Sequence, residues 1–224
     1  QLDLEMSFVD EEDVYEVGQK IFYNIFTHFS DKEVSPIPFK RIPYKEAMLK
    51  YGSDKPDLRN PLLIEDLTAI LSKSTFEPFK TLNIRGIKVD NIDKSNSWYK
   101  KIEEYIKSLG ATGMSYIKVN EDMTFKSSID KFLTDDLRKE LIEKCHLNKG
   151  NALFILADNK HKIDKLAGLL RTKLGNELDL INKNKFEFCI INDFPMYEYN
   201  EDEGKVDFNH NPFSMPQGGM EALE

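Results

Sequence analysis

Hydrophobic and polar positions alternate at the start of the chain and then recur with helical spacing. Over residues 1–8 every second residue is apolar, which predicts a strand with one polar face. From residue 14 to residue 29 the apolar positions return every three or four residues, which predicts an amphipathic helix. A shorter helix is expected over residues 44–51, and it should end at Gly52, because glycine is common just beyond helix ends.

The middle of the chain alternates between strand patterns and helix patterns. Strands are expected over residues 82–89, 114–119 and 152–157, and helices over residues 97–109, 134–145 and 160–174. Thr134 is the expected N-cap of the second helix, and Gly175 is the expected end of the third. This stretch of about 100 residues is long enough to fold independently, so it predicts an α/β domain.

After residue 184 the pattern returns to strands. Residues 186–191 form an apolar run of strand length. Residues 196–199 and 205–209 flank an acidic turn that ends at Gly204, which predicts a hairpin with glycine at a position of positive φ.

These changes of pattern predict two domains. We expect one discontinuous domain over residues 1–72 and 184–224, interrupted by an α/β domain over residues 73–183. The formal net charge is −8, yet residues 81–180 hold 18 Lys and Arg against 15 Asp and Glu. A mildly basic middle fits two units with different roles, although a solvated surface also gives such a surplus by chance.

The composition excludes several classes of protein. A charged fraction of 31% and a hydrophobic fraction of 40% are ordinary for a globular protein. No apolar run reaches the roughly 18 residues of a membrane helix. The 2 cysteines and 4 histidines lack metal-binding spacing, so we expect no metal site and a reducing, cytoplasmic location. Because the chain starts at Gln1 rather than Met, we expect that it was cut from a longer protein.

Three places carry side chains that could bind a ligand. On the polar face of the first strand, Asp3 lies with Gln1 and could hold an ammonium group, although an exposed edge strand has the same pattern. In the loop after the short helix, Lys55 and Arg59 could bind phosphate, whereas basic residues in a turn are often only solvated. A lone histidine such as His210 is more often structural than functional. Spacing alone therefore identifies no reaction.

Several segments resemble bacterial aspartyl-tRNA synthetases, in the order expected for that family. Residues 51–59 read YGSDKPDLR, residues 193–196 read DFPM, and residues 210–213 read HNPF, where the family has an H-x-P-F signature. Residues 1–8 are similar to the strand that completes the second motif of class II synthetases. The stretch between these segments, such as GMSYIKV at residues 113–119, is like a domain that bacterial members insert into the catalytic core.

The resemblance runs along the whole chain and implies an α+β fold. In that fold, part of the antiparallel-sheet catalytic core of a class II synthetase is interrupted by an inserted α/β domain. The implied enzyme is an aspartate-tRNA ligase that activates L-aspartate with ATP and Mg²⁺ and transfers it to tRNA. The resemblance also implies a homodimer and no membrane association.

The resemblance assigns substrate binding to three residues. Asp3 would contact the α-ammonium group of aspartate, with Gln1 beside it, and His210 would recognise the side-chain carboxylate. Asn211 stands where many relatives have a second histidine. The family's adenylate-contacting arginines have no counterpart in the sequence. We therefore expect no catalytic residue, no cofactor bound to the isolated chain and no charging of tRNA by it.

The main alternative is a non-catalytic module that contacts tRNA and is related to the insert of a tRNA-dependent amidotransferase. An unrelated α/β interaction domain is a more distant alternative. The flanking segments favour the synthetase, because a binding module has no need of residues 1–8 or 210–213.

Overall fold

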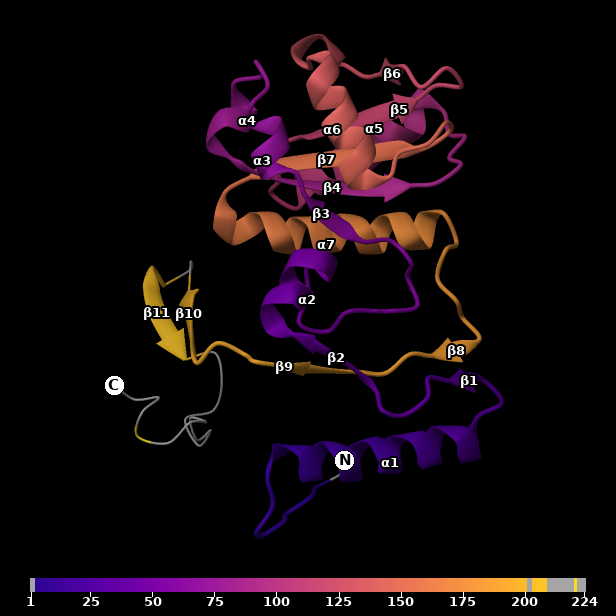
Figure 1. Ribbon diagram of the computed structural model, residues 1–224, viewed down its shortest axis with the longest axis vertical. Coiled ribbons are helices and arrows are strands. Elements are labelled where there is room, and N and C mark those ends of the chain that lie inside the picture. The colour runs from indigo at the N-terminus through magenta and orange to yellow at the C-terminus, as the bar shows by residue number, and fades with distance from the viewer. Residues whose placement is uncertain (1–2, 201–202, 209–219, 221–224) are drawn as a thin grey trace.

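The computed structural model describes residues 3–200, 203–208 and 220. The elements are stacked along the long axis of the molecule (Figure 1). A sheet with its helices lies at one end, followed by α7, α2 and a pair of strands, and α1 lies at the other end.

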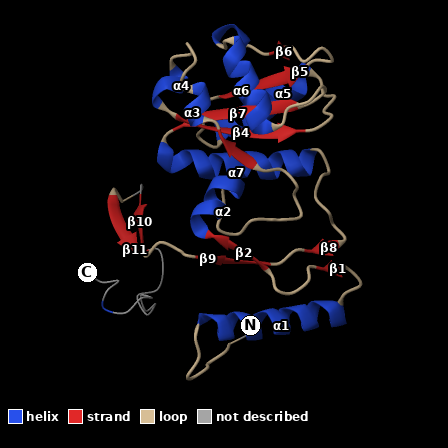
Figure 2. Cartoon of the chain, viewed as in Figure 1, coloured by secondary structure: helices blue, strands red, loops and turns tan. Residues whose placement is uncertain are grey.

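Helices and short strands alternate along most of the chain (Figure 2). In chain order the elements are α1 (Glu11–Phe29), β1 (Glu33–Val34), β2 (Lys40–Pro43), α2 (Tyr44–Tyr51), β3 (Ile64–Asp66), α3 (Thr68–Leu71), α4 (Pro78–Thr81), β4 (Asn83–Val89), α5 (Asn96–Ser108), β5 (Met114–Val119), β6 (Phe125–Lys126), a 3₁₀ turn (Asp130–Phe132), α6 (Asp135–Cys145), β7 (Ala152–Asp158), α7 (Lys160–Glu177), β8 (Lys185–Phe186), β9 (Cys189–Asn192), β10 (Tyr197–Asn200) and β11 (Lys205–Phe208).

The largest sheet has five strands in the order β3-β4-β7-β5-β6, and every neighbouring pair is antiparallel. The central strand β7 pairs with β4 from Ala152 opposite Val89 to Asp158 opposite Asn83. Successive side chains of a strand point to opposite faces, so a strand covered on both faces needs a continuous apolar run. This requirement explains the run ALFILA that begins β7.

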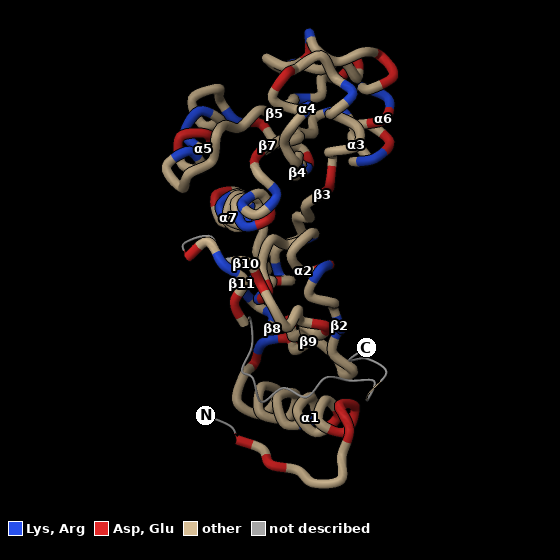
Figure 3. The backbone as a smooth tube through the Cα atoms, turned by 90° about the vertical axis from the view of Figure 1, so that its left-hand side faces the viewer, with Lys and Arg blue, Asp and Glu red and all other residues tan. Residues whose placement is uncertain are grey.

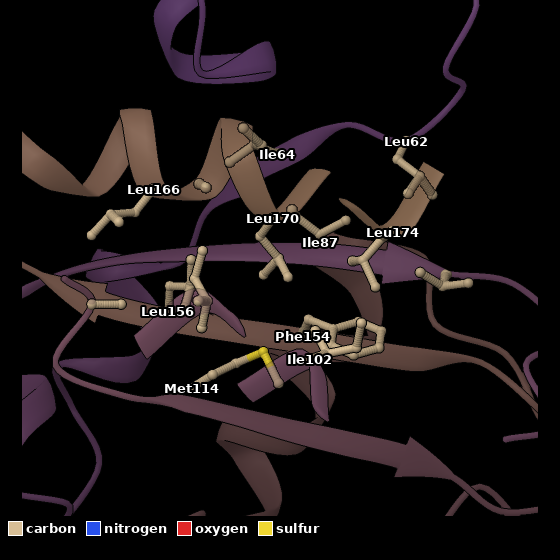
Figure 4. Packing of buried hydrophobic residues seen from close by; sticks show 14 of the residues in the cluster. Leu62, Ile64, Ile87, Ile102, Met114, Phe154, Leu156, Leu166, Leu170 and Leu174 are labelled. Carbon is tan, nitrogen blue, oxygen red and sulfur yellow. The ribbon is translucent and has the colours of Figure 1, made fainter. Parts of the chain in front are cut away.

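Helices cover both faces of this sheet. On one face, α5 and α7 pack over Phe154 and Leu156 (Figure 4). On the other face, α3, α4 and α6 pack over Leu153 and Ile155. The observed unit is therefore a three-layer α/β structure with an antiparallel sheet.

The helix starts follow local chemistry. The Thr134 hydroxyl accepts a hydrogen bond from the Leu137 amide at 3.3 Å, which confirms Thr134 as the N-cap of α6. At α1, Asp10 and Asp13 form a reciprocal capping box. Acidic residues gather in the first turn of α1 (Figure 3), where negative charge interacts favourably with the helix dipole.

The remaining strands form separate two-stranded sheets. β1 pairs with β8 and β2 pairs with β9, both in parallel, so the segment after α7 returns to the segment after α1. β10 and β11 form the antiparallel hairpin that the sequence predicts, with Gly204 at φ 64°.

The strand predicted over residues 1–8 is wrong for its described part. Residues 3–8 form no strand, and Phe8 has a φ of 57°. Alternation creates a strand only where another strand can pair with it and an apolar layer can cover one face. In the described chain the apolar side chains of Leu4, Met6 and Phe8 are exposed, and the relative accessible surface of Phe8 is 107%. The two-domain division predicts that residues 1–8 pair with strands from residues 186–208 in one antiparallel sheet, and residues 3–8 do not form that pairing.

Three other expectations need correction. Helix α7 continues past Gly175 to Glu177, because Gly175 does not adopt the positive φ of a glycine that ends a helix, and it packs against Asn60. The run over residues 186–191 forms parts of two short strands, and its side chains are half-buried. The helix expected over residues 97–109 spans Asn96–Ser108 instead, with Tyr99, Ile102 and Ile106 buried and Leu109 exposed just beyond its end.

Candidate functional site

The three substrate residues predicted from the sequence are not brought together in the described chain. Asp3 is exposed and lies outside any strand. Gln1 and His210 lie outside the described residues, as does Asn211. The substrate roles of Asp3 and His210 require that both side chains face one cavity, and this arrangement stays a prediction.

Residues 51–59, which read YGSDKPDLR, are all described, and the loop that they form begins at the end of α2. Gly52 adopts a left-handed conformation with φ 67°, and its amide donates to the Met48 carbonyl at 2.9 Å. This geometry confirms the predicted end of the helix, because residues with a Cβ rarely adopt such a φ. The loop then leaves α2 toward α7.

Short-range hydrogen bonds shape the loop. The Ser53 hydroxyl accepts from the Lys55 amide at 3.0 Å, and Asp57 Oδ1 accepts from the Arg59 amide at 3.0 Å. At the end of the loop, Asn60 Oδ1 accepts from the Leu62 amide at 3.1 Å. Serine, aspartate and asparagine favour turns through such contacts with the backbone.

The two cations of the loop are each matched by a carboxylate of the same loop. Arg59 binds Asp57 with two hydrogen bonds, Nε to Oδ1 at 2.9 Å and Nη2 to Oδ2 at 2.8 Å. These contacts lower the pKa of Asp57 and raise the pKa of Arg59. Lys55 lies 3.0 Å from Asp54, exposed to solvent. The loop therefore presents balanced charge and hydrogen-bonding groups rather than an uncompensated cationic pair for phosphate.

A buried arginine on α7 binds the backbone of this loop. Arg171 is 2% exposed and donates to three backbone carbonyls, those of Leu62 at 2.6 Å, Asn60 at 2.7 Å and Asp57 at 2.9 Å. Its guanidinium carbon lies 5.0 Å from the centre of the Tyr51 ring. Burial lowers the pKa of Arg171, while Tyr51 and Asp57 raise it, and an arginine with these partners stays charged.

A second family-like segment lies at the other end of α2. β2 and β9 are parallel and end in register, Pro43 opposite Asn192, so the chain leaves both strands on the same side. Tyr44 begins α2 directly after β2, and the DFPM segment follows β9. The rings of Tyr44 and Phe194 are 4.9 Å apart. The strand pair therefore brings DFPM to the start of α2 and YGSDKPDLR to its end.

Sequence analysis missed Arg171 and Asn60, which determine where the loop lies. Arg171 was part of an amphipathic helix pattern, and its loop partners lie more than 100 positions away along the chain. A usable signal was present, because Gly168, Arg171 and Gly175 recur with helical spacing beside the apolar stripe of α7.

The described residues contain no group of three or more His, Cys, Asp or Glu side chains that could hold a metal ion. None of the helices in the described chain is long and apolar enough to cross a membrane.

Comparison with known proteins identifies relatives along the whole chain. The aspartate–tRNA(Asp/Asn) ligases of Rickettsia bellii (strain OSU 85-389) and Rickettsia felis are each 48% identical to it over 230 residues. The corresponding ligase of Rickettsia prowazekii is 47% identical. Each comparison covers 100% of this chain and 38% of the relative, so the chain spans well under half the length of these ligases.

The family comparison gives the same result. The sequence pattern of the family described as tRNA synthetases class II (D, K and N) matches residues 1–223. The match includes both the region of paired strands and the five-stranded sheet, as well as the two segments that meet α2. The chain belongs to the class II tRNA synthetases of the D, K and N group.

Proposed function

We propose that this chain is part of an aspartate-tRNA ligase that activates aspartate with ATP and transfers it to tRNA. The observation that carries this proposal is the 47–48% identity to ligases of that name over the full chain. Since the chain spans only 38% of those relatives, the activity is proposed for the longer protein, and the 224-residue chain alone is proposed to be inactive.

We further propose that residues 1–72 and 184–224 belong to the catalytic domain and that residues 73–183 are inserted into it. In support, the end of the middle unit lies beside the first segment, because the Asn182 amide donates to the Arg59 carbonyl at 3.3 Å. Strand β3 lies before residue 73 but pairs with β4. The end of the first catalytic segment is therefore shared with the sheet of the insert.

For the substrate, we propose that Asp3 and Gln1 bind the α-ammonium group of aspartate and that His210 binds its side-chain carboxylate. The chemistry supports these roles, because a carboxylate forms strong hydrogen bonds with an ammonium group and an imidazole donor suits a carboxylate. A site that pairs both charged groups of aspartate rejects analogues that leave its own polar groups unpaired.

ATP, Mg²⁺, tRNA and a homodimeric state belong to the proposal for the longer protein. The described residues offer no group of metal ligands, so no step of the reaction is assigned to a metal held by them.

The proposal is tested by aspartate-dependent exchange of pyrophosphate into ATP. The longer protein should catalyse this exchange, and the 224-residue chain should remain at background after removal of host synthetases. In the longer protein, His210→Ala should raise the KM for aspartate roughly thirtyfold, because loss of a donor to a charged group costs about 2 kcal/mol.

His28→Ala is the matched control, because His28 lies in the last turn of α1 and is exposed. Its KM for aspartate should match that of the unmodified protein. An unchanged KM in His210→Ala would remove the substrate assignment. Binding of tRNA by the longer protein without aspartate-dependent exchange would instead favour the non-catalytic module.

A further inference from the structure

Helix α7 has two faces that contact different parts of the chain. One face carries Ile163, Leu166, Ala167, Leu170 and Leu174, all of which are buried in the core cluster that includes the sheet. The other carries Asp164, Gly168, Arg171 and Gly175. These four residues are spaced three or four positions apart, so they follow one another along a neighbouring face of the helix.

The second face fits closely against the segment from Gly52 to Leu62. A Cβ atom added at Gly168 would overlap the carbonyl group of Gly52, and one added at Gly175 would overlap the Asn60 side chain. The approach is reciprocal, because a Cβ at Gly52 would overlap the backbone of α7 at Gly168. Only residues without a side chain permit this contact.

Arg171 lies between the two glycines on the same face. Its guanidinium group donates to the carbonyls of Asp57, Asn60 and Leu62, and the Asn60 side chain donates back to the Arg171 carbonyl at 3.0 Å. Each of these contacts joins the helix to backbone groups or to a buried side chain, rather than to exposed side chains. The contacts therefore define the path of the loop, in which Lys55 is exposed and Ser53 and Asp54 are half-buried.

We propose that α7 is a clamp for the loop of residues 52–60, that this loop borders the substrate site of the proposed ligase, and that Arg171 is a positioning residue for it. The link to a substrate site rests on the proposed function, whereas the clamp itself does not. The proposal gives the inserted domain a specific role, because α7 is its last helix and the loop belongs to the catalytic segment.

The geometry predicts that lysine cannot replace arginine at position 171. Nε of Arg171 binds the Leu62 carbonyl, while Nη2 binds the carbonyls of Asp57 and Asn60. A single ammonium group carries the same charge but cannot reach all three acceptors with the planar fork of a guanidinium. Arg171→Lys therefore tests the geometry and leaves the charge in place.

The first test is amide hydrogen exchange in the 224-residue chain. Arg171→Lys should accelerate exchange in peptides covering residues 53–60 at least about tenfold, since the lost hydrogen bonds exceed about 1.4 kcal/mol. Peptides covering β4 and β7 should change less than about twofold, because their protection reports the sheet.

Arg138→Lys is the matched control. Like Arg171, Arg138 donates to a backbone carbonyl, that of Asp130 at 3.0 Å, and it adds ion pairs to Asp130 at 2.9 Å and Asp135 at 2.6 Å, but it lies on α6. The Arg138→Lys variant should leave amide hydrogen exchange in residues 53–60 unchanged.

Gly168→Ala provides a second variant that keeps Arg171 intact. The added methyl group displaces the loop, so residues 53–60 should again exchange faster while the sheet stays protected. Unchanged protection of the loop in both variants would overturn the clamp. Equal loss of protection in the loop and the sheet would also overturn it, because Arg171 would then support the whole fold.

The second test uses the longer protein and separates positioning from general stability. Arg171→Lys should raise the KM for aspartate or ATP in pyrophosphate exchange roughly tenfold, with kcat per titrated active site within about twofold. A merely structural role would lower the number of active sites and leave both KM values unchanged, and this result would overturn the positioning role. If the unmodified longer protein shows no pyrophosphate exchange, the proposed function fails. The amide hydrogen exchange of residues 53–60 in the 224-residue chain still tests the clamp.

Discussion

Two regions of the molecule use similar apolar patterns but bury them to different extents. The sheet region runs from β3 to α7, and the strand-pair region comprises α1, β1, β2 and α2 together with β8 and β9. In the sheet region, two clusters of buried side chains cover both faces of five strands. In the strand-pair region, one small cluster contains Ile42, Ala47 and Tyr51 as its buried members. On α1, large apolar side chains including Phe22, Ile25 and Phe29 are exposed.

The difference shows that apolar patterning requires enough partners to become a core. A two-stranded sheet has a single neighbouring strand and is marginal by itself, whereas three or more strands with a covered face are stable. Consistent with this, a hollow of about 330 Å³ lies between α1 and β9, lined by residues such as Phe22, Phe39 and Phe188. We infer that the sheet region provides most of the free energy of unfolding.

The largest effect is expected when a phenylalanine is replaced by alanine in each of the two regions. Phe154 is 0% exposed and stacks on Tyr99 with 5.5 Å between ring centres. Phe154→Ala should lower the free energy of unfolding by about 4 kcal/mol, measured by urea denaturation. Phe188→Ala removes a half-buried ring from the other region and should cost clearly less. Equal losses would contradict the comparison.

A smaller effect is expected from the two cysteines. Burial raises the pKa of the Cys145 thiol in the sheet region to about 12, and it also raises the pKa of the half-buried Cys189. A thiol reagent at about pH 8 should label Cys189 at least about tenfold faster, because reaction requires an accessible thiolate. Faster labelling of Cys145 would show that the sheet region opens more easily.

The same shift gives a pH dependence with a definite sign. Unfolded Cys145 releases its proton near the ordinary thiol pKa of 9.0, whereas the folded thiol has its pKa raised to about 12. The unfolded state then binds fewer protons, so the free energy of unfolding should fall as the pH rises through this range. Cys145→Ala should remove this part of the pH dependence in urea titrations between about pH 8 and about pH 10.

The smallest effect is expected at two helix caps. Thr134→Ala removes a hydrogen bond at the start of α6 in the sheet region and should lower the free energy of global unfolding by about 1 kcal/mol. Asp10→Ala removes the capping box of α1, and the loss of stability there should appear mainly as faster amide exchange within that helix. A global loss of the same size in both variants would show that the two regions unfold as one unit.

The sequence predicts elements whose signals are local. The end of α2 and the start of α6 follow from Gly52 and Thr134, which act on their own neighbours in the chain. Strands β1, β2 and β3 were not predicted, because their few residues become strands only by pairing with partners far along the chain. The predicted strand over residues 1–8 is wrong in its described part for the complementary reason, since a pattern without a partner forms no ladder.

The candidate site shows the same limit. The resemblance identified the loop of residues 51–59, and residue chemistry suggested phosphate binding by Lys55 and Arg59. The pairing of these cations with Asp54 and Asp57 depends on how the loop turns, which composition does not show. The roles of Asp3, Gln1 and His210 came from resemblance and remain proposals.

The contacts of Arg171 impose an order of events on synthesis at the ribosome. The Asp57 and Leu62 carbonyls lie 114 and 109 positions before the arginine that binds them. The loop therefore leaves the ribosome long before its partner has been translated. Contacts so distant in sequence form late, because the intervening chain must first be ordered. The short turns at Ser53 and Asp57 can form at once, whereas the final path of the loop has to wait for the last helix of the sheet region.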